Sequence, residues 1–552
     1  QKTYKMFSTI FRDFILNPYL VYVISIGIII FLIWRLYIEF YEYLIKEQCR
    51  RQNLKFVRIP SQSMALLRKK RYDIVETEMI KTNGKLFGAN MLNEMTIYVA
   101  DAELVQIICN REFTKFSNRR VFLLEDPVWD NLLFATNDEK WKRLRSIMSP
   151  AFSSGKLRKF KYCIDDTFKI MAMNLDKSIA RDPVINVKQL VGAFTMDTII
   201  QISMGMRIDS LKDPNNLIIK YARKLFGHDI NIRDTLVFFI AFFHPKLLKY
   251  LHLRFQGEAI DYFKKCVLEI VEKKRKEMKN RQESMKATNF IELVLEVEKE
   301  QESMMSQQQQ QQNGNAKPFK HITIDEMIAQ CITFFTVGYD TTATTITNTC
   351  YTMATNPEKQ EKLYKSIIET LEQLANERDD GCNDPYELIT FDTLNRFEYL
   401  NACLNESMRF LTLVAATERL ATEDCRIETS DKKIWFNVKK GNVIRIPILS
   451  LHKDSENFSQ PDQFIPERFL PEQNNDVERN FNKYAFMPFG TGPRKCIASN
   501  LAILEAKMAL IHLFRMYRLS VDQKRTKIPI DYYINADLLI SKDVYLHVEQ
   551  RL

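Results

Sequence analysis

One cysteine of this sequence stands where a protein would place a metal-binding thiolate. Residues 489–498 have the sequence Phe-Gly-Thr-Gly-Pro-Arg-Lys-Cys-Ile-Ala. Two glycines and a proline predict a tight turn that ends at Cys496, and the apolar run after it predicts a helix. A helix N-terminus favours a thiolate, and glycines let backbone N–H groups approach its sulfur. An isolated cysteine would more often be a buried structural residue, so the role of Cys496 depends on other stretches of the chain.

A long helix is predicted over about 324–354, and its middle is unusual. A capping-box pattern at 323–326 begins it, and the Asn-Pro pair at 356–357 ends it. Residues 338–342, Gly-Tyr-Asp-Thr-Thr, interrupt an otherwise apolar sequence. Threonine hydroxyls inside a helix can bond the carbonyl one turn back and open a groove. Because such residues weaken a helix, we expect this part of it to serve a functional site.

Two pairs of residues have the spacing of neighbours on a helix. Trp141 and Arg145 lie four residues apart, and Glu406 and Arg409 lie three apart. Taken alone, the first pair would indicate a surface cation–π contact and the second a solvated ion pair. Residues 466–469, Pro-Glu-Arg-Phe, supply a further arginine, Arg468.

These stretches, in this order, resemble the signatures of the cytochrome P-450 superfamily of haem-thiolate proteins. The loop resembles Phe-x-x-Gly-x-Arg-x-Cys-x-Gly, and the matching residues are Phe489, Gly492, Arg494 and Cys496, with Ala498 at the final glycine. Residues 338–342 resemble (Ala/Gly)-Gly-x-(Asp/Glu)-Thr-(Thr/Ser), with Val337 at the first position. The two helix pairs resemble Trp-x-x-x-Arg and Glu-x-x-Arg.

The resemblance implies haem b as the cofactor and Cys496 as the axial ligand of its iron. It also implies that Phe489 and Arg494 belong to the haem-binding loop. Trp141 and Arg145 would bond haem propionates. Arg419 follows Arg409 by ten residues, the family spacing for a further propionate partner, although the usual prolines between them are absent.

The resemblance assigns the catalytic roles to the interrupted helix. Thr341 would hold dioxygen and water with its hydroxyl, and Asp340 would relay protons as a general acid. Glu406, Arg409 and Arg468 would be structural residues that lock the core behind the haem.

The resemblance covers nearly everything after the N-terminal segment and implies a mainly α fold with a small β region, the cytochrome P-450 fold. We expect one haem domain over 61–552, with the Gln-rich segment 301–318 as a low-complexity surface loop. Alternating apolar residues predict a strand at 96–99, and two hairpin strands at 434–438 and 442–446 around Gly441.

The N-terminal segment has the pattern of a membrane anchor. After a tail at 1–16, residues 17–37 are long and apolar enough to predict one transmembrane helix, followed by a basic linker at 38–60. A cleavable signal peptide is the alternative, but the run exceeds such a segment and no small-residue cleavage site follows it. The basic residues after the run place the downstream domain in the cytosol.

Charge and cysteine content indicate which classes of partner and site this protein can have. A net charge of +10 over 552 residues suits an anionic membrane surface or an acidic protein, and is too diffuse for nucleic acid. The ten cysteines are scattered without a C-x-x-C pair, which argues against a zinc site or a disulfide framework.

We therefore expect a monooxygenase that inserts one atom of dioxygen into an apolar organic substrate. The resemblance implies electrons from NADPH through NADPH-cytochrome P-450 reductase, with cytochrome b5 as a further partner, at the endoplasmic reticulum membrane. A reductase-independent haem-thiolate isomerase or dehydratase is one alternative, although such enzymes typically lose the acid–threonine pair. A non-catalytic haem-binding protein is another. Substrate choice is expected at 121–133, Phe239, Phe334, Val414 and the loop near Asn535.

Overall fold

The computed structural model describes ten stretches of the chain, which are residues 18–59, 71–91, 93–213, 216–225, 231–280, 289–292, 294–296, 322–471, 481–533 and 537–551. The predicted tail at 1–16, the Gln-rich segment at 301–318 and Asn535 lie outside the described residues.

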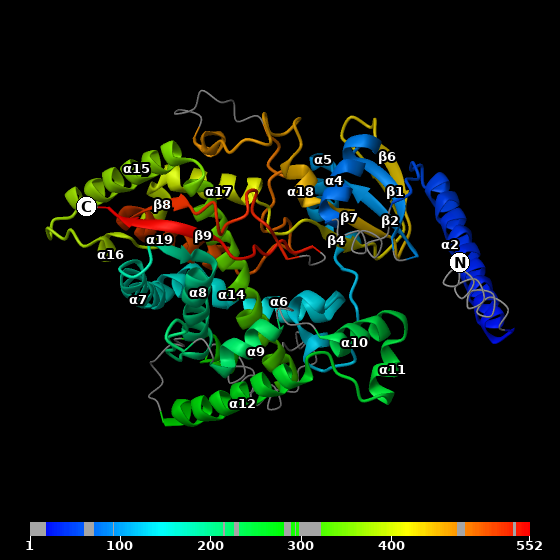
Figure 1. The fold of residues 1–552 in the computed structure, drawn as a ribbon, viewed down its shortest axis with the longest axis horizontal. Helices are drawn as coiled ribbons and strands as arrows, with labels where there is room; N and C mark the ends of the chain where they lie inside the picture. Colours follow the sequence, from blue (N-terminus) through cyan, green and yellow to red (C-terminus); the bar gives the residue numbers. More distant parts are fainter. Residues whose placement is uncertain are drawn as a thin grey trace, which may run out of the picture.

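Helices make up most of the described chain (Figure 1), as predicted. The helices before the Gln-rich segment are α2 (Pro18–Arg51), α4 (Tyr72–Asn83), α5 (Ala102–Gln106), α6 (Asp138–Met148), α7 (Ser154–Ile179), α8 (Val187–Met204), α9 (Leu217–Leu225), α10 (Ile232–Phe243), α11 (Pro245–Tyr250) and α12 (Gly257–Asn280). Those after it are α14 (Ile324–Ala354), α15 (Pro357–Asn376), α16 (Pro385–Leu388), α17 (Glu398–Phe410), α18 (Ile448–His452) and α19 (Ser499–Met516).

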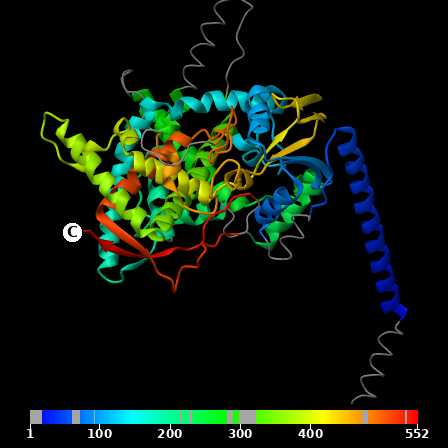
Figure 2. The same cartoon turned by 90° about the horizontal axis from the view of Figure 1, so that it is seen from above.

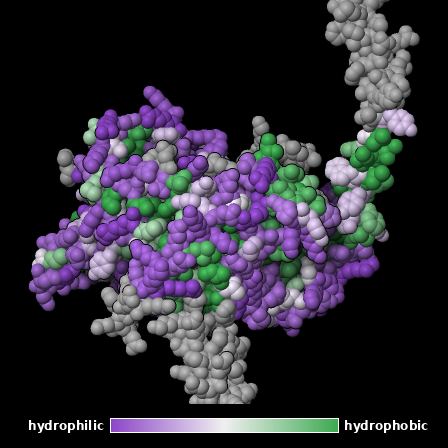
Figure 3. Space-filling model, turned by 90° about the horizontal axis from the view of Figure 1, so that it is seen from below, coloured by the Kyte–Doolittle hydropathy of each residue, from purple (hydrophilic) through white to green (hydrophobic). Residues whose placement is uncertain are grey.

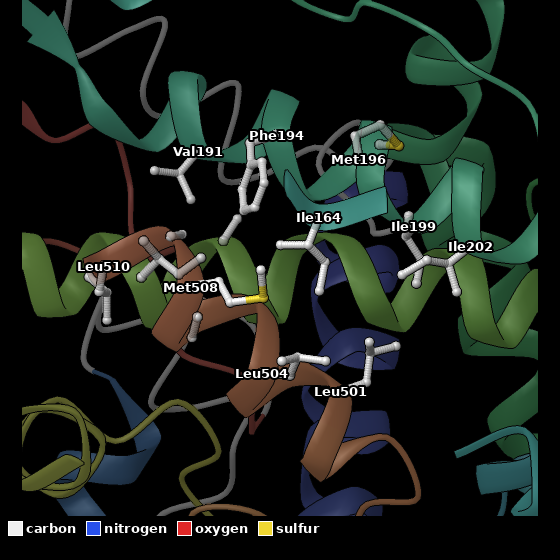
Figure 4. Packing of buried hydrophobic residues seen from close by; sticks show 14 of the residues in the cluster. Ile164, Val191, Phe194, Met196, Ile199, Ile202, Leu501, Leu504, Met508 and Leu510 are labelled. Atoms are coloured by element: carbon white, nitrogen blue, oxygen red, sulfur yellow. The ribbon is translucent and has the colours of Figure 1, made fainter. Parts of the chain in front are cut away.

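Helix α14 is the central element of the molecule. Its first turn carries the predicted capping box, in which Glu326 N–H donates to Thr323 Oγ1 and Thr323 N–H donates to Glu326 Oε2. Most of its residues are buried, because α8, α12, α17 and α19 all pack against it. Figure 4 shows the apolar side chains of α8 and α19, together with Ile164 of α7, gathered around α14. This core fixes the helices that carry the candidate site.

The described chain also contains three small sheets, and β8 and β9 of one of them add buried residues to this core. The strands are β1 (Leu86–Met91), β2 (Glu94–Val99), β3 (Val184–Asn186), β4 (Thr417–Leu420), β5 (Cys425–Glu428), β6 (Trp435–Val438), β7 (Val443–Ile446), β8 (Tyr517–Val521) and β9 (Tyr545–Gln550). A four-stranded sheet has the order β1-β2-β7-β4, a three-stranded sheet has the order β3-β9-β8, and β5 pairs with β6. The first and second of these sheets lie at opposite ends of the molecule (Figure 1). The strand predicted at 96–99 is confirmed as part of β2.

The prediction that the segments around Gly441 form a hairpin is wrong. Both are strands, but among the described strands β6 pairs with β5 alone, whereas β7 lies parallel to β2 and antiparallel to β4. All four residues of β7 are buried, as in a central strand. Both faces of β7 are buried, and its one charged residue, Arg445, is paired with Glu76. The strand therefore gains more from a place between two strands than from pairing with the half-exposed β6.

Helix α2 extends away from the body of the molecule (Figure 2). It continues without a break through the first part of the predicted linker and ends at Arg51. Only its last turns pack on the sheet, where Ile45 and Cys49 are buried. Within the described residues, no helix is both long enough and apolar enough to cross a membrane. The anchor over 17–37 therefore stays a prediction.

Candidate functional site

The loop that carries Cys496 is a tight turn built on two glycines. Gly490 and Gly492 have φ values of 72° and 73°, in the left-handed region that residues with a side chain rarely adopt. A Cβ atom on Gly492 would lie 1.9 Å from the carbonyl oxygen of Cys109, so only glycine fits against that backbone. The turn is closed by hydrogen bonds from Gly490 N–H to Met487 O at 2.9 Å and from Lys495 N–H to Gly492 O at 3.0 Å.

Cys496 lies two residues before Ala498, the N-cap of α19. Its own N–H donates to Phe489 O at 2.9 Å, which joins the two ends of the loop. Burial raises the pKa of the Cys496 thiol, and the Ala498 N–H that points to the sulfur opposes this shift. The sulfur therefore has a backbone donor and a helix N-terminus beside it, which are the features that stabilise a metal-bound thiolate.

Four arginines surround this cysteine from four different parts of the chain. Arg145 comes from α6, Arg419 from β4, Arg494 from the cysteine loop, and Arg119 from the segment before α6. Burial, aided by the charges of the other three arginines, lowers the pKa of Arg494 to about 9. Burial likewise lowers the pKa of Arg119 to about 10, with Arg419 as the next cause. Cations held together in this way need an anion.

Within the described part of the chain, no Asp or Glu carboxylate forms an ion pair with any of these four arginines. The buried Nε atoms of Arg119 and Arg419 have no hydrogen-bond partner there. Buried guanidinium groups are normally paired, and their donors match carboxylates in two-point contacts. The site therefore fits a group that brings its own carboxylates close to the cysteine sulfur, as the two propionates of haem would.

The side-chain N–H groups of Arg494 donate hydrogen bonds within the protein. It donates from Nε to Ser117 O at 2.8 Å, from Nη1 to Thr136 O at 2.9 Å and from Nη2 to Asn137 Oδ1 at 3.1 Å. Its guanidinium also stacks on the ring of Trp141, the first residue of the predicted propionate pair. Arg494 is thus placed to hold the loop against α6, while Arg119, Arg145 and Arg419 keep donors available.

The predicted structural triad is buried as one network. Glu406 accepts from Arg409 Nε at 2.7 Å and from Arg468 Nε at 3.2 Å. Arg409 also donates to His452 O at 2.7 Å, and His452 Nε2 accepts the N–H of Met487 at 3.1 Å. Met487 begins the turn that leads to Cys496, so the network reaches the cysteine loop through His452.

The interrupted part of α14 has two different faces. Thr341 is half-buried, and its hydroxyl donates to Val337 O at 2.6 Å, as expected for a threonine that bonds one turn back. Asp340 is completely buried and pairs with Lys188 of α8, with 2.5 Å between Oδ1 and Nζ. Gly338 lets α8 approach closely, because a Cβ there would meet Ile199 at 2.7 Å.

Comparison with known proteins identifies the family of the chain. A family model described as Cytochrome P450 matches residues 62–546. The chain belongs to the cytochrome P450 family. It is 28% identical over 500 residues to Cytochrome P450 3A12 of Canis lupus familiaris, with 89% of this chain and 90% of that protein covered. It is 29% identical over 485 residues to Cytochrome P450 3A6 of Oryctolagus cuniculus, with 86% of this chain and 87% of that protein covered.

Membership of this family makes the chain a haem-dependent monooxygenase of the eukaryotic microsomal type, with haem b as its cofactor. The residues of this cytochrome P450 that the structure brings together around Cys496 agree with that cofactor. Haem held by these residues would supply the iron at which dioxygen is activated, and a thiolate ligand would favour cleavage of the O–O bond.

Sequence reasoning missed three residues of this P450 site. Arg119 belongs to the arginine cluster, His452 supports the cysteine loop, and Lys188 pairs with Asp340. None stands in one of the motifs, and each acts on a residue far away in the chain. The only signal was chemical, because Lys188 stands beside a mostly apolar run of sequence, and a lysine buried there needs a partner.

Proposed function

We propose that this cytochrome P450 uses Cys496 as the axial ligand of haem iron and oxidises an apolar organic substrate with electrons from a separate NADPH-dependent reductase. The arginine cluster carries the proposal. Four guanidinium groups that converge near the half-buried Cys496, without an ion-paired carboxylate in the described chain, are costly unless a dianionic group binds there.

We assign separate roles in haem binding and proton transfer to the residues of this site. Arg119, Arg145 and Arg419 bind the propionates, while Trp141 and Arg494 hold α6 against the cysteine loop. Thr341 offers a hydroxyl on the face of α14 where Val337 is 39% exposed. A hydroxyl at that position can hold a water molecule and pass a proton, which is the general acid function that dioxygen cleavage needs.

The proposed substrate is apolar because the segments predicted to contact it are apolar. In the loop at 121–133, Phe122 and Leu123 are partly exposed, and Phe122 lies 6.1 Å from Phe238 of α10. Phe334, in contrast, is buried between Phe152 and Phe290, so it shapes the core more than a substrate surface. These contacts support an apolar pocket and leave the chemical class of the substrate open.

A surface pocket next to the cysteine loop supports docking of the reductase. The pocket has a volume of about 360 Å³. Its lining includes Lys495 of the cysteine loop, Asn401 of α17 and Lys507 of α19. Lys495 is exposed, and burial lowers the pKa of Lys507 to about 8. An exposed lysine beside the thiolate, here Lys495, suits an acidic electron-transfer partner, and cytochrome b5 would use the same chemistry.

We further propose that the protein sits on the endoplasmic reticulum membrane with its haem domain in the cytosol. Apolar side chains of α2 are exposed on the part that extends from the body, where they form green patches among paler residues in Figure 3. They include Ile30, Phe31, Ile33 and Trp34. In α10, Phe239 is 62% exposed. Large exposed apolar surfaces of this kind are covered by lipid or by another protein.

The first experiment is the difference spectrum of the reduced, carbon-monoxide-bound protein, for the wild type, Cys496→Ser and Cys382→Ser. The control removes a cysteine outside the site, in the loop before α16. We expect a strongly red-shifted Soret band that only Cys496→Ser loses. A spectrum like that of a histidine-ligated haem, or a band that survives in Cys496→Ser, would overturn the proposal.

A turnover assay then tests the reductase. With a purified NADPH-dependent reductase, substrate oxidation should require both NADPH and dioxygen. Rearrangement of an organic peroxide without reductase would instead indicate an isomerase. Neither reaction, in a protein that shows the red-shifted band, would indicate a haem carrier.

A further inference from the structure

Lys507 of α19 is a buried lysine without an ion-pair partner among the described residues. The residue is 9% exposed, and its ammonium donates to Asn395 Oδ1 at 3.5 Å. A neutral amide at that distance compensates little of the charge. Burial lowers the pKa of Lys507 to about 8. Because a buried lysine is normally paired with an anion, this one has an unmet need for a negative charge.

Asn401 of α17 carries an unsatisfied acceptor beside this lysine. Its Nδ2 donates to Asn395 O at 3.3 Å, so Asn401 and Lys507 both contact Asn395. The buried Oδ1 atom of Asn401 has no hydrogen-bond partner in the described part of the chain. A buried amide oxygen without a donor is unfavourable. The surroundings of Asn395 therefore combine a cation that needs an anion with an acceptor that needs a donor.

Lys507 and Asn401 both line the surface pocket next to the cysteine loop. Its volume of about 360 Å³ lies within the range of about 300–1,000 Å³ that is usual for small-molecule sites. Apolar side chains of α17, of the turn before Cys496 and of α19 form another part of its lining. They include Leu404, Met408, Phe486, Phe489 and Ile503. The pocket thus offers apolar contacts beside the two unsatisfied polar groups.

We propose that this pocket binds a small apolar carboxylate with a hydroxyl group on the carbon next to the carboxylate. The carboxylate pairs with the ammonium of Lys507, and the hydroxyl donates to Asn401 Oδ1. The apolar part of the ligand, such as an aromatic ring, packs against Phe486 and Phe489. A carboxylate without the hydroxyl satisfies only Lys507, and a neutral alcohol satisfies only Asn401. The α-hydroxy carboxylate is the class that satisfies both.

This pocket is separate from the place at which substrate oxidation is proposed. Its described lining comes from α17, from α19 and from residues 486–490 and 495, whereas Thr341 lies on α14. The inference therefore does not rest on the proposed monooxygenase activity. Gly490 belongs both to this lining and to the turn that leads to Cys496, so a ligand in the pocket contacts the cysteine loop.

The test is a calorimetric titration of the haem-loaded protein with phenyllactate, phenylpropionate and methyl phenyllactate. Phenylpropionate lacks the hydroxyl, and the methyl ester lacks the negative charge. Each titration is repeated with saturating clotrimazole, a bulky azole that coordinates haem iron and fills the substrate side. We expect phenyllactate to bind about tenfold more tightly than either analogue, because each analogue loses one hydrogen-bonded group. Clotrimazole should leave this preference unchanged.

Two variants test the two polar contacts separately. Lys507→Met replaces an unpaired buried cation by an apolar side chain, so the fold should tolerate it. It should remove the preference for phenyllactate over its methyl ester. Asn401→Leu should remove the preference for phenyllactate over phenylpropionate. Lys161→Met is the matched control and should keep both preferences, because Lys161 is also mostly buried but pairs with Asp165 on α7, outside the pocket.

Three outcomes would overturn the inference. The three probes could bind the wild type equally. Clotrimazole could abolish the binding of phenyllactate, which would place that ligand on the substrate side. Lys507→Met could keep the wild-type preference for phenyllactate over its ester. Each of these is distinct from failure of the proposed function, because the red-shifted carbon monoxide band of the wild type would still show thiolate-bound haem.

Discussion

The guanidinium of Arg494 stacks on the indole of Trp141, with 3.9 Å between its Cζ atom and the ring centroid. The two residues come from the cysteine loop and from α6. Because Arg494 also donates to two backbone carbonyls before α6, one side chain connects these segments. The relative position of the cysteine sulfur and the propionate-binding residues therefore depends on this stacked arginine.

Arg494→Lys should reduce haem binding although it keeps the charge. Lysine has neither the planar face that stacks on Trp141 nor the forked donors that reach three acceptors. We expect the free energy of unfolding to fall by about 3 kcal/mol, since hydrogen bonds to charged groups contribute about 1.5–3 kcal/mol. The measurements are haem content after purification and urea unfolding. Arg378→Lys, at an exposed pair with Asp380, is the control. Full haem content in Arg494→Lys would contradict the stacking role.

Gly492→Ala should abolish the red-shifted band, whereas Gly381→Ala should not. Both glycines have positive φ values, 73° and 67°, so alanine is strained at both positions. Only at Gly492 would the new Cβ collide with the carbonyl of Cys109, because nothing lies within 4 Å of a Cβ at Gly381. The comparison separates backbone strain from the close approach of the loop to Cys109. Equal loss of haem in the two variants would show that strain alone is responsible.

Acid should weaken the cysteine loop through His452. Burial, aided by the charges of Arg409 and Lys453, lowers the pKa of His452 from 6.5 to about 3. Below pH 6.5 the unfolded state binds a proton that the folded state does not, so stability falls as the pH decreases from 6.5 towards 3. Between pH 7 and pH 5 this effect amounts to about 2 kcal/mol.

The measurement for His452 is the difference in unfolding free energy between wild type and His452→Gln at the two pH values. Glutamine keeps an acceptor for the Met487 N–H but does not titrate. The wild type should therefore lose about 2 kcal/mol more than the variant on acidification. Parallel losses in both proteins would assign the acid sensitivity to other groups.

Glu406→Gln should destabilise the protein by about 3–5 kcal/mol, the cost of leaving buried cations without their anion. Glu406 is completely buried and pairs with both Arg409 and Arg468. Glu139→Gln removes a carboxylate from the exposed pair with Lys142 and should have little effect. Urea unfolding followed by the Soret band measures both variants. If Glu406→Gln unfolds at the midpoint of the Glu139→Gln variant, the network does not contribute to stability.

The sequence by itself determined the local features of this protein. The capping box and the terminal Asn-Pro pair located α14, because such signals act within a few residues of one another. The glycines, the arginine and the cysteine of the loop at 489–498 indicated the chemistry of the site, because their spacing is local as well. The mainly helical fold was implied by the resemblance to the P-450 superfamily, and the strand at 96–99 was predicted from its local residue pattern.

Only the tertiary structure decided which distant residues meet. Lys188 and Asp340 are 152 positions apart, and no spacing rule connects them. Arg119 joins the arginine cluster because the segment before α6 folds over the cysteine loop. The partners of β6 and β7 depended on which faces the rest of the fold buries. Such contacts arise from the packing of whole elements, and a pattern within one element carries no record of its partner.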